Sequence, residues 1–427
     1  MRSLISLGRV LTLRNSLSYR IPLSWKTLSY HSSDVALSST SHDPMESQHI
    51  VAPIHLDPFI DEPMEIIRHV AEDTRGHVRN YASKHKLKLV GILASSSNPF
   101  EDSSDTYASW ISKTLEEDGI DYETWRVQMH TSTTELQLSR LVHRANHMDS
   151  VHGVLVYYPL FHKYPYVLGL DPITGVWSED RERMKLKDPN NCTMILEKNK
   201  RVLPGLTYKT RDDVFRDTIN SHRDVEGLGP LYHNRRLFCN PKIYIDHEDD
   251  GPLRQVLFPC TALAVVRIVK RALSCKQSAL YDQTKPIGRR FEGTTVTIIN
   301  RSDILGRPLA SMLANDGAKV WSIDHDSIIL YKPTTGRMNR CPGARMTMEK
   351  CIKESSVIVT AVPSGTFKIN ADWIQPHSTV VNVASEPNVD EDDLRGIHGV
   401  TYFPKVGAVT VAMLEQNLVK LHKRFHA

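Results

Sequence analysis

The first half of the chain alternates between helical and strand-like spacing of apolar residues. Apolar positions recur every three or four residues over 61–83, which predicts a helix, and the unbroken apolar run at 88–95 predicts a buried strand. Helical spacing returns over 106–120 and ends at Gly119, and 151–160 is a second β-rich run. Strand, helix and strand in this order predict a parallel sheet with helical crossovers.

The middle of the chain lacks this regularity. Residues 163–206 are polar and irregular, and a structureless segment of this length is unusual inside a compact domain. We interpret it as a surface insertion, with an artefact of the gene model as the alternative. Regular spacing resumes at 223–233, and 258–273 has the pattern of a helix with Pro259 near its start.

The second half opens with a strand–helix–strand pattern. An apolar strand is predicted at 294–300, and an amphipathic helix at 302–317 that ends at Gly317. A second strand follows at 319–324. This unit of about 30 residues has the size of half a dinucleotide-binding fold.

The turn after the first of these strands departs from the usual G-x-G-x-x-G pattern. It contains Asn300, Arg301, Ser302 and Gly306. Asn tolerates a positive φ better than most residues, so we expect Asn300 to make the tight turn. Ser302 and nearby backbone N–H groups are then expected to face a pyrophosphate at the helix N-terminus.

Cofactor choice depends on the end of the second strand, where Asp324 follows Ile323. A carboxylate about 20 residues beyond the turn accepts hydrogen bonds from the adenosine ribose and repels a 2′-phosphate, which favours NAD. Arg301 argues for NADP, because a guanidinium can hold that phosphate. We give Asp324 more weight, because it lies where discrimination normally occurs. The alternative is a solvent-facing acid at a strand end.

Two later strand patterns complete the predicted nucleotide site. They lie within 355–367 and 378–387, and each ends in a polar turn. In an open α/β sheet the carboxyl ends of the strands line the ligand crevice. We therefore assign Ala361, Val362 and Pro363 to the cofactor site.

Charge changes this picture only at the N-terminus. The 427 residues include 53 basic and 49 acidic ones, but five of the basic residues and no acid precede Asp34. The remainder is nearly neutral, which does not suggest a nucleic-acid partner. An acid-free start rich in Arg and Ser is typical of a mitochondrial transit peptide; a disordered tail, a misassigned start codon and a cytosolic protein are the alternatives. No apolar run reaches the roughly 18 residues that a membrane span needs.

Cysteine and histidine spacing does not suggest a metal site. The six cysteines form no C-x-x-C pair, which argues against a disulfide framework or a zinc site and fits a reducing compartment. His143 and His147 lie four residues apart without the Glu of a zincin helix. The acidic stretch 245–251 lacks the spacing of an EF-hand, and we interpret it as a solvated loop.

Taken in order, several blocks resemble the methylenetetrahydrofolate dehydrogenase/cyclohydrolase family. The resemblance covers roughly 61–160 and 207–424, and it is closest to the monofunctional, NAD-dependent members. It is carried by VGILASSSNPFEDSSDTYASWISKT, VHGVLVYYPL, RDVEGL, FPCTALAVVRIV, INRSDILGRPLASMLANDGAKVWSID, VIVTAVPSGTF and VGAVTVAMLEQN.

The resemblance implies an α/β fold with substrate held between two domains. A folate-binding α/β domain would span 51–275 and a Rossmann NAD-binding domain 276–404, with a leader and linker at 1–50. The C-terminal segment, 405–427, would return as a helix to the first domain. Family membership further implies NAD as cofactor, 5,10-methylenetetrahydrofolate as substrate, and a homodimer.

The resemblance also assigns residues on the substrate side. Tyr107 matches the Tyr that stacks on the folate, with a plain core aromatic as the alternative. Glu226 takes the place of the carboxylate that recognises the pterin N–H groups, with a surface charge as the alternative. Tyr157 replaces the Gln of bifunctional members, and Gly407 lies in the substrate-binding VGAVT block.

One departure from the family pattern bears on the chemistry. Bifunctional members carry Y-x-x-x-K, whose Lys supports cyclohydrolase activity, whereas Ile111 stands at that position here. We keep Lys113 as a candidate substrate contact. It is six residues from Tyr107 and therefore lies on a different part of the helix, which makes it a poor substitute for that Lys. Hydride transfer needs no strong base, but hydrolysis of the product needs an activated water. We therefore expect dehydrogenase activity without cyclohydrolase activity.

Three alternatives remain. A bifunctional dehydrogenase/cyclohydrolase would need a substitute for the missing Lys at Ile111. A non-catalytic folate- or nucleotide-binding homologue would not need Tyr107, Glu226, Ser302 and Asp324 together. A Rossmann oxidoreductase for another small molecule would not explain RDVEGL or VGAVTVAMLEQN.

Overall fold

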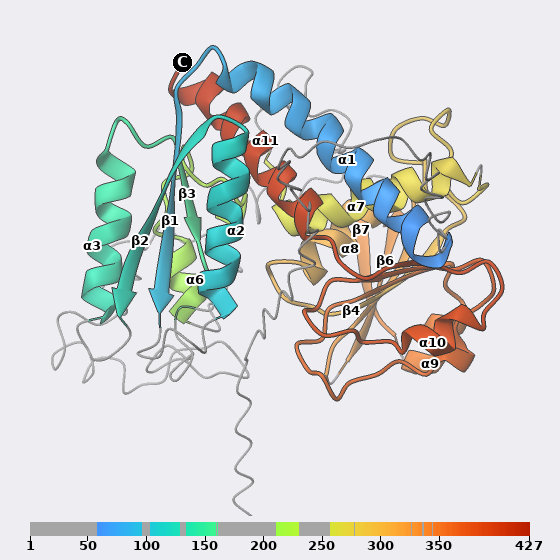
Figure 1. Ribbon diagram of the computed structural model, residues 1–427. Helices are drawn as coiled ribbons and strands as arrows, with labels where there is room; N and C mark the ends of the chain where they lie inside the picture. Colours follow the sequence, from blue (N-terminus) through green and yellow to red (C-terminus); the bar gives the residue numbers. More distant parts are fainter. Residues whose placement is uncertain are drawn as a thin grey trace, which may run out of the picture.

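The computed structural model contains two α/β units side by side, joined by two long helices (Figure 1). These helices are α1 (Pro58–Ala82) and α11 (Gly407–Phe425). The structure describes residues 58–95, 103–128, 134–158, 160, 211–229, 257–276, 278–325, 327–334, 337–343 and 345–427. The predicted leader and linker (1–50), the insertion (163–206) and the acidic stretch 245–251 lie outside the described residues.

The first unit contains three parallel strands in the order β2-β1-β3. Its strands are β1 (Leu87–Ser95), β2 (Ile120–Gln128) and β3 (Gly153–Val156), and its helices are α2 (Ser103–Glu117), α3 (Thr134–His147) and α6 (Arg211–Arg216). The predicted parallel sheet with helical crossovers is confirmed. Strand β2 was not predicted, because charged residues interrupt its apolar ones.

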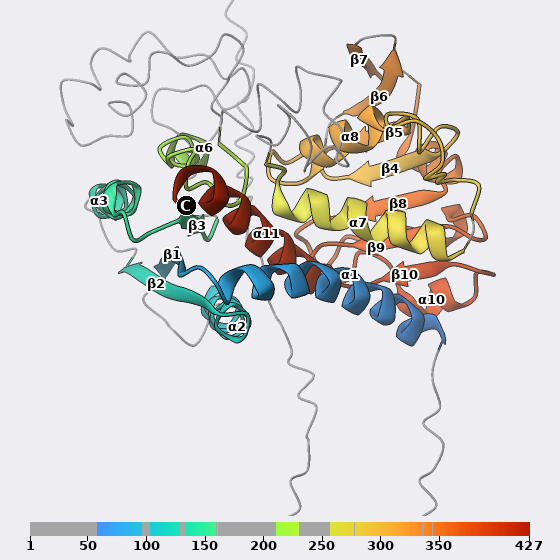
Figure 2. The ribbon, with the colours of Figure 1, turned by 90° about the horizontal axis from the view of Figure 1, so that it is seen from above.

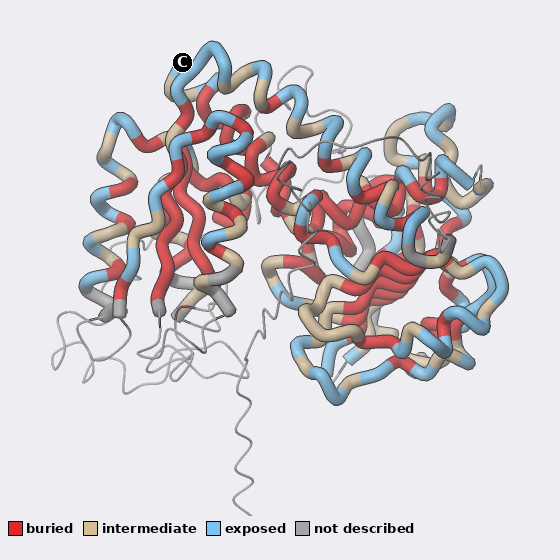
Figure 3. Tube along the Cα trace, viewed as in Figure 1, coloured by how far each residue is buried: buried red, intermediate tan, exposed pale blue. Residues whose placement is uncertain are grey.

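Both faces of this sheet are covered, as the continuous apolar pattern of β1 requires. Leu87 and Leu89 pack with α1, α2 and α11 in one core. Val90 and Ile92 point to the opposite face and pack with α3 in a second core. Side chains alternate along a strand, so neighbouring residues of β1 serve different cores. Figure 3 shows buried residues along β1 and β3.

The second unit is a seven-stranded sheet in the order β10-β9-β8-β4-β5-β6-β7. Five strands are parallel, and the hairpin β6–β7 extends the sheet in antiparallel fashion. The strands are β4 (Thr295–Ile299), β5 (Lys319–Ile323), β6 (Ile328–Thr334), β7 (Arg337–Pro342), β8 (Val357–Thr360), β9 (Thr379–Asn382) and β10 (Thr401–Phe403). The helices are α7 (Cys260–Cys275), α8 (Gly306–Asn315), α9 (Met348–Lys353), α10 (Glu391–Arg395) and the 3-10 turn η4 (Ala371–Trp373).

The strand order reverses at β4, which pairs with β5 on one side and with β8 on the other. Connections that leave in opposite directions open a crevice at the carboxyl ends of these two strands. The predicted strands at 294–300 and 319–324 correspond to β4 and β5. The helix predicted from residue 302 begins only at Gly306, because residues 303–305 form a turn.

The C-terminal helix α11 returns to the first unit, as the family resemblance implied. It packs against both α1 and α7, and the views in Figures 1 and 2 show it running beside α1 between the two sheets. Its apolar residues, including Val411, Leu414 and Leu418, belong to the same core as α2 and α8. One continuous core therefore supports both units.

A buried acidic pair lies where α11 meets α1. Asp118 is almost fully buried and accepts hydrogen bonds from Arg75 Nε at 2.5 Å and from Arg79 Nη1 at 3.1 Å. Burial, and next the charge of Asp118, raise the pKa of Glu415 on α11 to about 9. Glu415 is therefore protonated at neutral pH, and α11 packs without a second buried charge at this position.

Histidines meet where the end of α11 docks on the first unit. His152 Nδ1 accepts the backbone N–H of Lys88 at 2.9 Å. The His152 ring lies edge-on to His422, with 4.7 Å between ring centroids, and 5.3 Å from the ring of His426. Burial, together with these two neighbours, lowers the pKa of His152 to about 4. The cluster thus favours neutral histidine.

Acidification should weaken this docking through His152. Its folded pKa of about 4 lies below the ordinary 6.5, so the unfolded chain binds more protons between those values and stability falls as pH falls from 6.5 towards 4. His152→Asn keeps an acceptor for Lys88 but cannot be protonated. Thermal unfolding from pH 7.5 to 5 should show a smaller loss of Tm in this variant than in the wild type.

The matched control is His143→Asn, which replaces an exposed histidine on α3. Its Tm should follow the wild-type dependence on pH. Equal pH dependence in the wild type and in His152→Asn would contradict the assignment.

Candidate active site

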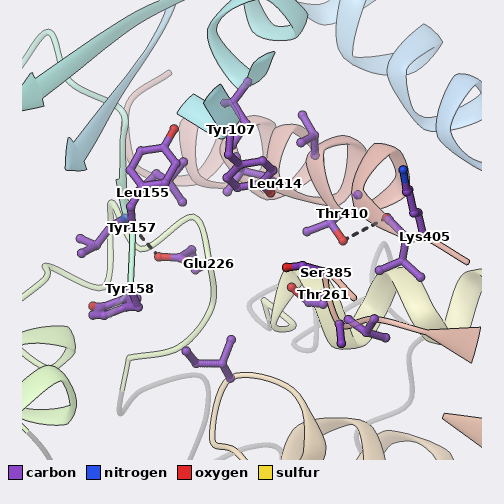
Figure 4. Close-up of a pocket in the computed structure, with 18 residues that line it drawn as sticks. Tyr107, Leu155, Tyr157, Tyr158, Glu226, Thr261, Ser385, Lys405, Thr410 and Leu414 are labelled. Carbon is purple, nitrogen blue, oxygen red and sulfur yellow. Dashed lines mark hydrogen bonds between the residues drawn. The ribbon is translucent and has the colours of Figure 1, made fainter. Parts of the chain in front are cut away.

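A cavity of about 250 Å³ lies between the two units and is lined by both. The first unit contributes residues 155–158 at the end of β3, together with part of α2. The second contributes residues 383–385 after β9, and the start of α11 closes the wall near Gly407. Figure 4 shows Tyr107, Tyr157 and Glu226 on one side of this space and Ser385, Thr410 and Lys405 on the other. The cavity therefore joins carboxyl ends of strands from two sheets.

Helix α2 presents an aromatic side chain and an apolar one to the cavity. The ring of Tyr107 lies edge-on to that of Tyr157, with 6.1 Å between centroids and an interplanar angle of 90°. Ile111, one turn further along, lines the same wall and is 1% exposed. The side chain of Lys113 is 78% exposed and lies 4.0 Å from Glu117, because six residues rotate it away from Tyr107. The structure therefore places Lys113 away from the cavity.

Glu226 lies in a tight turn beside the end of β3. Its Oε2 accepts the backbone N–H of Val156 at 3.2 Å. Gly227 follows with a φ of +66°, and a side chain there would press against the Phe258 backbone at 3.0 Å. Burial raises the pKa of Glu226 to about 8, which outweighs the opposing effect of the Val156 hydrogen bond. At neutral pH this carboxyl therefore favours its protonated form.

Two buried side chains, which were not predicted from the sequence, hydrogen-bond the backbone of the turn that contains Glu226. Asp224 accepts backbone N–H groups of Leu228 at 3.3 Å and Gly229 at 2.7 Å. Asn417 on α11 donates to the carbonyls of Val225 at 2.8 Å and Phe258 at 3.0 Å. Both side chains are buried, so their hydrogen bonds fix the backbone that presents Glu226. Asp224 and Asn417 stand inside motifs quoted above, but their contacts depend on tertiary structure.

On the cofactor side, Asn300 shapes the turn with its side chain. It does not adopt a positive φ, so the expectation of a left-handed turn residue is wrong. Its Oδ1 accepts both the N–H of Ser302 at 2.8 Å and the Ser302 hydroxyl at 2.7 Å. Its Nδ2 donates to the Ala361 carbonyl at 2.9 Å. The amide thus joins the loops that follow β4 and β8.

Ser302 and Gly306 set the approach of α8 to this turn. Ser302 is exposed, but both of its donors are engaged by Asn300 in this arrangement, and Arg307 N–H donates to its carbonyl at 3.1 Å. The predicted contact of Ser302 with a pyrophosphate would require its hydroxyl to turn. A side chain at Gly306 would overlap the Asn300 carbonyl, so only glycine permits this close approach.

Arg301 is engaged by β5 and by the turn between β5 and β6. Its guanidinium donates to Ser322 O and Ser327 O, each at 2.7 Å, and to Ser327 Oγ at 2.6 Å. Its side chain is 7% exposed, and Nη1 lies 4.0 Å from Asp324 Oδ2. The Asp324 side chain is 48% exposed just beyond buried Ile323. This geometry favours Asp324 over Arg301 as the group that meets a ribose.

Two buried asparagines order the remaining cofactor-side loops. Asn388 Oδ1 accepts the N–H of Val362 at 2.9 Å, and its Nδ2 donates to the Val362 carbonyl at 3.1 Å. Asn382 accepts the N–H of Asn388 at 3.2 Å and donates to Ala384 O and Pro404 O. The segment 361–363 is therefore fixed relative to the loops after β9 and β10.

The described residues contain neither a candidate metal site nor a candidate membrane-spanning helix. No group of three or more His, Cys, Asp or Glu side chains in the described part could hold a metal ion. No helix there is long and apolar enough to cross a membrane. His143 and His147 lie together on exposed positions of α3, with 4.1 Å between ring centroids.

Both units match family models. Residues 63–168 match the tetrahydrofolate dehydrogenase/cyclohydrolase catalytic domain, and residues 259–426 match the corresponding NAD(P)-binding domain. These ranges contain the cavity-lining parts of α2 and β3 and the loops that follow β4, β5, β8 and β9.

Relatives match over most of the chain. A methylenetetrahydrofolate dehydrogenase [NAD(+)] from Dictyostelium discoideum is 31% identical over 362 residues, covering 82% of this chain and 91% of the relative. The enzyme of that name from Schizosaccharomyces pombe is 28% identical, covering 78% and 84%. The solved NAD-dependent 5,10-methylenetetrahydrofolate dehydrogenase from Saccharomyces cerevisiae is 26% identical, with a TM-score of 0.62 and coverage of 84% and 96%.

Proposed function

Since this chain belongs to the tetrahydrofolate dehydrogenase/cyclohydrolase family, we propose that it oxidises 5,10-methylenetetrahydrofolate to 5,10-methenyltetrahydrofolate with NAD+. One observation carries this proposal. The cavity joins the wall formed by Tyr107, Tyr157 and Glu226 to loops at the carboxyl ends of the nucleotide-binding sheet. A folate ring and a nicotinamide could therefore meet face to face there.

The substrate wall has the groups that a pterin requires. Adjacent N–H donors of a pterin pair with a carboxylate, and Glu226 offers one at the cavity wall. Tyr107 supplies an aromatic surface for the ring system. Glu226 Oε2 already accepts the Val156 N–H, which fixes the carboxylate relative to the end of β3.

The nucleotide half suits NAD. Asp324 offers a partly exposed acceptor for ribose hydroxyls, whereas the Arg301 guanidinium is engaged by Ser322 and Ser327. When bound, NAD+ supplies a hydride acceptor at nicotinamide C4. Asn300 and Asn388 hold the loops that border its expected position. The exposed carboxylate of Asp324, together with an Arg301 guanidinium already bound to Ser322 and Ser327, supports NAD rather than NADP.

The protein's part in the reaction is alignment. As the methylene carbon loses hydride, lone pairs on its two nitrogens stabilise the resulting cation, so no strong base is needed at that step. Ile111 and Tyr157 line the wall where bifunctional members carry Lys and Gln. An apolar side chain there disfavours the activated water that hydrolysis requires. We propose that the enzyme stops at methenyltetrahydrofolate.

The cofactor assignment is tested by assays of the purified protein with methylenetetrahydrofolate and either NAD+ or NADP+. Asp324→Ser should weaken NAD+ binding by about 1–3 kcal/mol, the scale of a hydrogen bond to a charged group, and improve NADP+ use. Asp372→Ser, an exposed acid in η4, is the control and should change neither. A wild-type enzyme that prefers NADP+ would falsify the NAD assignment, and one that oxidises no methylenetetrahydrofolate would overturn the function.

Glu226 should make folate recognition depend on pH. Its pKa of about 8 means that the free enzyme is mostly protonated there at pH 7, whereas pterin binding uses the carboxylate. The kcat/KM for folate should therefore rise from pH 6 and level off above about pH 9. Glu226→Gln should abolish this rise and lose roughly 1.5–3 kcal/mol of transition-state binding at pH 9. A wild-type profile that is flat over this range would exclude the role.

We further propose a mitochondrial homodimer in one-carbon metabolism, with the methenyl product available to purine synthesis. The acid-free leader supports the location, and the family resemblance supports the dimer. Residues 1–40 fused to a fluorescent protein should direct it to mitochondria, and light scattering of the purified enzyme should give twice the chain mass. Import should fail when Ser replaces the five basic leader residues, Arg2, Arg9, Arg14, Arg20 and Lys26. A diffuse signal from the unchanged leader would favour the cytosol.

A further inference from the structure

Tyr122 reaches the candidate active site from a strand that does not border it. It lies on β2, and β1 separates β2 from β3. Its hydroxyl nevertheless lies 2.6 Å from that of Tyr157, directly after β3. Both side chains are 8% exposed. A hydrogen bond thus spans the full width of the middle strand.

The crossing depends on a gap in that middle strand. Gly91 stands opposite Thr124 of β2 and Leu155 of β3. A side chain at Gly91 would overlap the Tyr122 hydroxyl and lie 3.1 Å from the Tyr157 ring. The absence of a side chain therefore creates the channel through which the two phenols meet.

The hydroxyl pair ends at the cavity, because Tyr157 lines the cavity wall whereas Tyr122 does not. Burial raises the pKa of Tyr122 and of Tyr157 above the ordinary value, so both phenols stay neutral during turnover.

The other side of Tyr157 is fixed by packing. Tyr107 meets its ring edge-on, and the Tyr157 backbone N–H donates to the Ile92 carbonyl at 3.1 Å. Backbone, ring and hydroxyl are therefore each restrained by a different element. The hydroxyl restraint comes from Tyr122, which does not line the cavity.

We propose that Tyr122 is a positioning residue of the active site, which acts through the gap at Gly91 to fix the ring and hydroxyl direction of Tyr157 against the substrate. This inference rests on the proposed dehydrogenase function. A wall fixed in this way holds the methylene carbon at one distance from its hydride acceptor, and small displacements at that distance cost much of the rate. Tyr122 itself touches neither reacting atom.

A double-mutant cycle on the full-length enzyme tests the inference. Tyr122→Phe keeps the ring and removes the hydroxyl, and Tyr157→Phe removes its partner. We expect kcat to fall on the order of tenfold in each single variant, with the KM for NAD+ changed less than twofold. Because Tyr122 acts through Tyr157, the double variant should be no slower than Tyr157→Phe alone.

An isotope effect separates positioning from general loss of structure. With substrate deuterated at the methylene carbon, Tyr122→Phe should show a larger effect on kcat than the wild type, because hydride transfer becomes more rate-limiting. Tyr402→Phe removes a buried hydroxyl from β10 and is the control that should leave both values unchanged.

The outcomes distinguish the inference from the function it rests on. If the wild type oxidises methylenetetrahydrofolate but losses at Tyr122 and Tyr157 multiply, Tyr122 is only a structural residue and the inference is overturned. An unchanged kcat in Tyr122→Phe overturns it as well. An inactive wild type instead overturns the proposed function itself.

Discussion

One buried amide connects the segments on which the cavity depends. Asn417, on the C-terminal helix, donates to the carbonyls of Val225 and Phe258. The first carbonyl immediately precedes Glu226, and the second precedes the start of α7, which packs on the nucleotide-binding sheet. Buried carbonyls without partners are costly, so the last helix must stay docked for both segments to keep their positions.

This constraint explains why the cavity is built at the joint between units rather than within either one. The carboxyl ends of β3 and of the parallel strands of the larger sheet face the same space, and α11 closes it. Glu226 and Tyr107 belong to one side, whereas Ser385 belongs to the other. Alignment of two ligands therefore depends on how the units sit together, and α1 and α11 both fix that arrangement.

The parts of the fold that follow from local pattern could be predicted from the sequence. Apolar periodicity indicated the first strand and the central βαβ unit, and the family resemblance implied the last helix. The spacing of Tyr107 and Ile111 placed both on one helix face. What could not be predicted depends on register and strand order. Nothing in IDYETWRVQ indicates that Tyr122 meets Tyr157, because that contact requires β1 between them and glycine at the crossing.

The turn after β4 shows the same limit at a smaller scale. The sequence shows that this turn lacks the usual glycines. It predicts that the backbone conformation of Asn300 replaces them, whereas in the structure the Asn300 side chain shapes the turn. The side-chain amide of Asn300 hydrogen-bonds Ser302, which is close in sequence, and Ala361, which lies 61 residues further along the chain. Only the pairing of β4 with β8 brings that second partner within reach.

The lack of a side chain at Gly91 also couples the evolution of positions 91 and 122. With Tyr122 in its present position, position 91 must be glycine, because any larger residue there would occupy the space of the Tyr122 hydroxyl. A lineage could therefore acquire the tyrosine only while position 91 was glycine, and would then lose the freedom to change it. The tolerance of position 91 to substitution would thus depend on a residue 31 positions away, on a different strand.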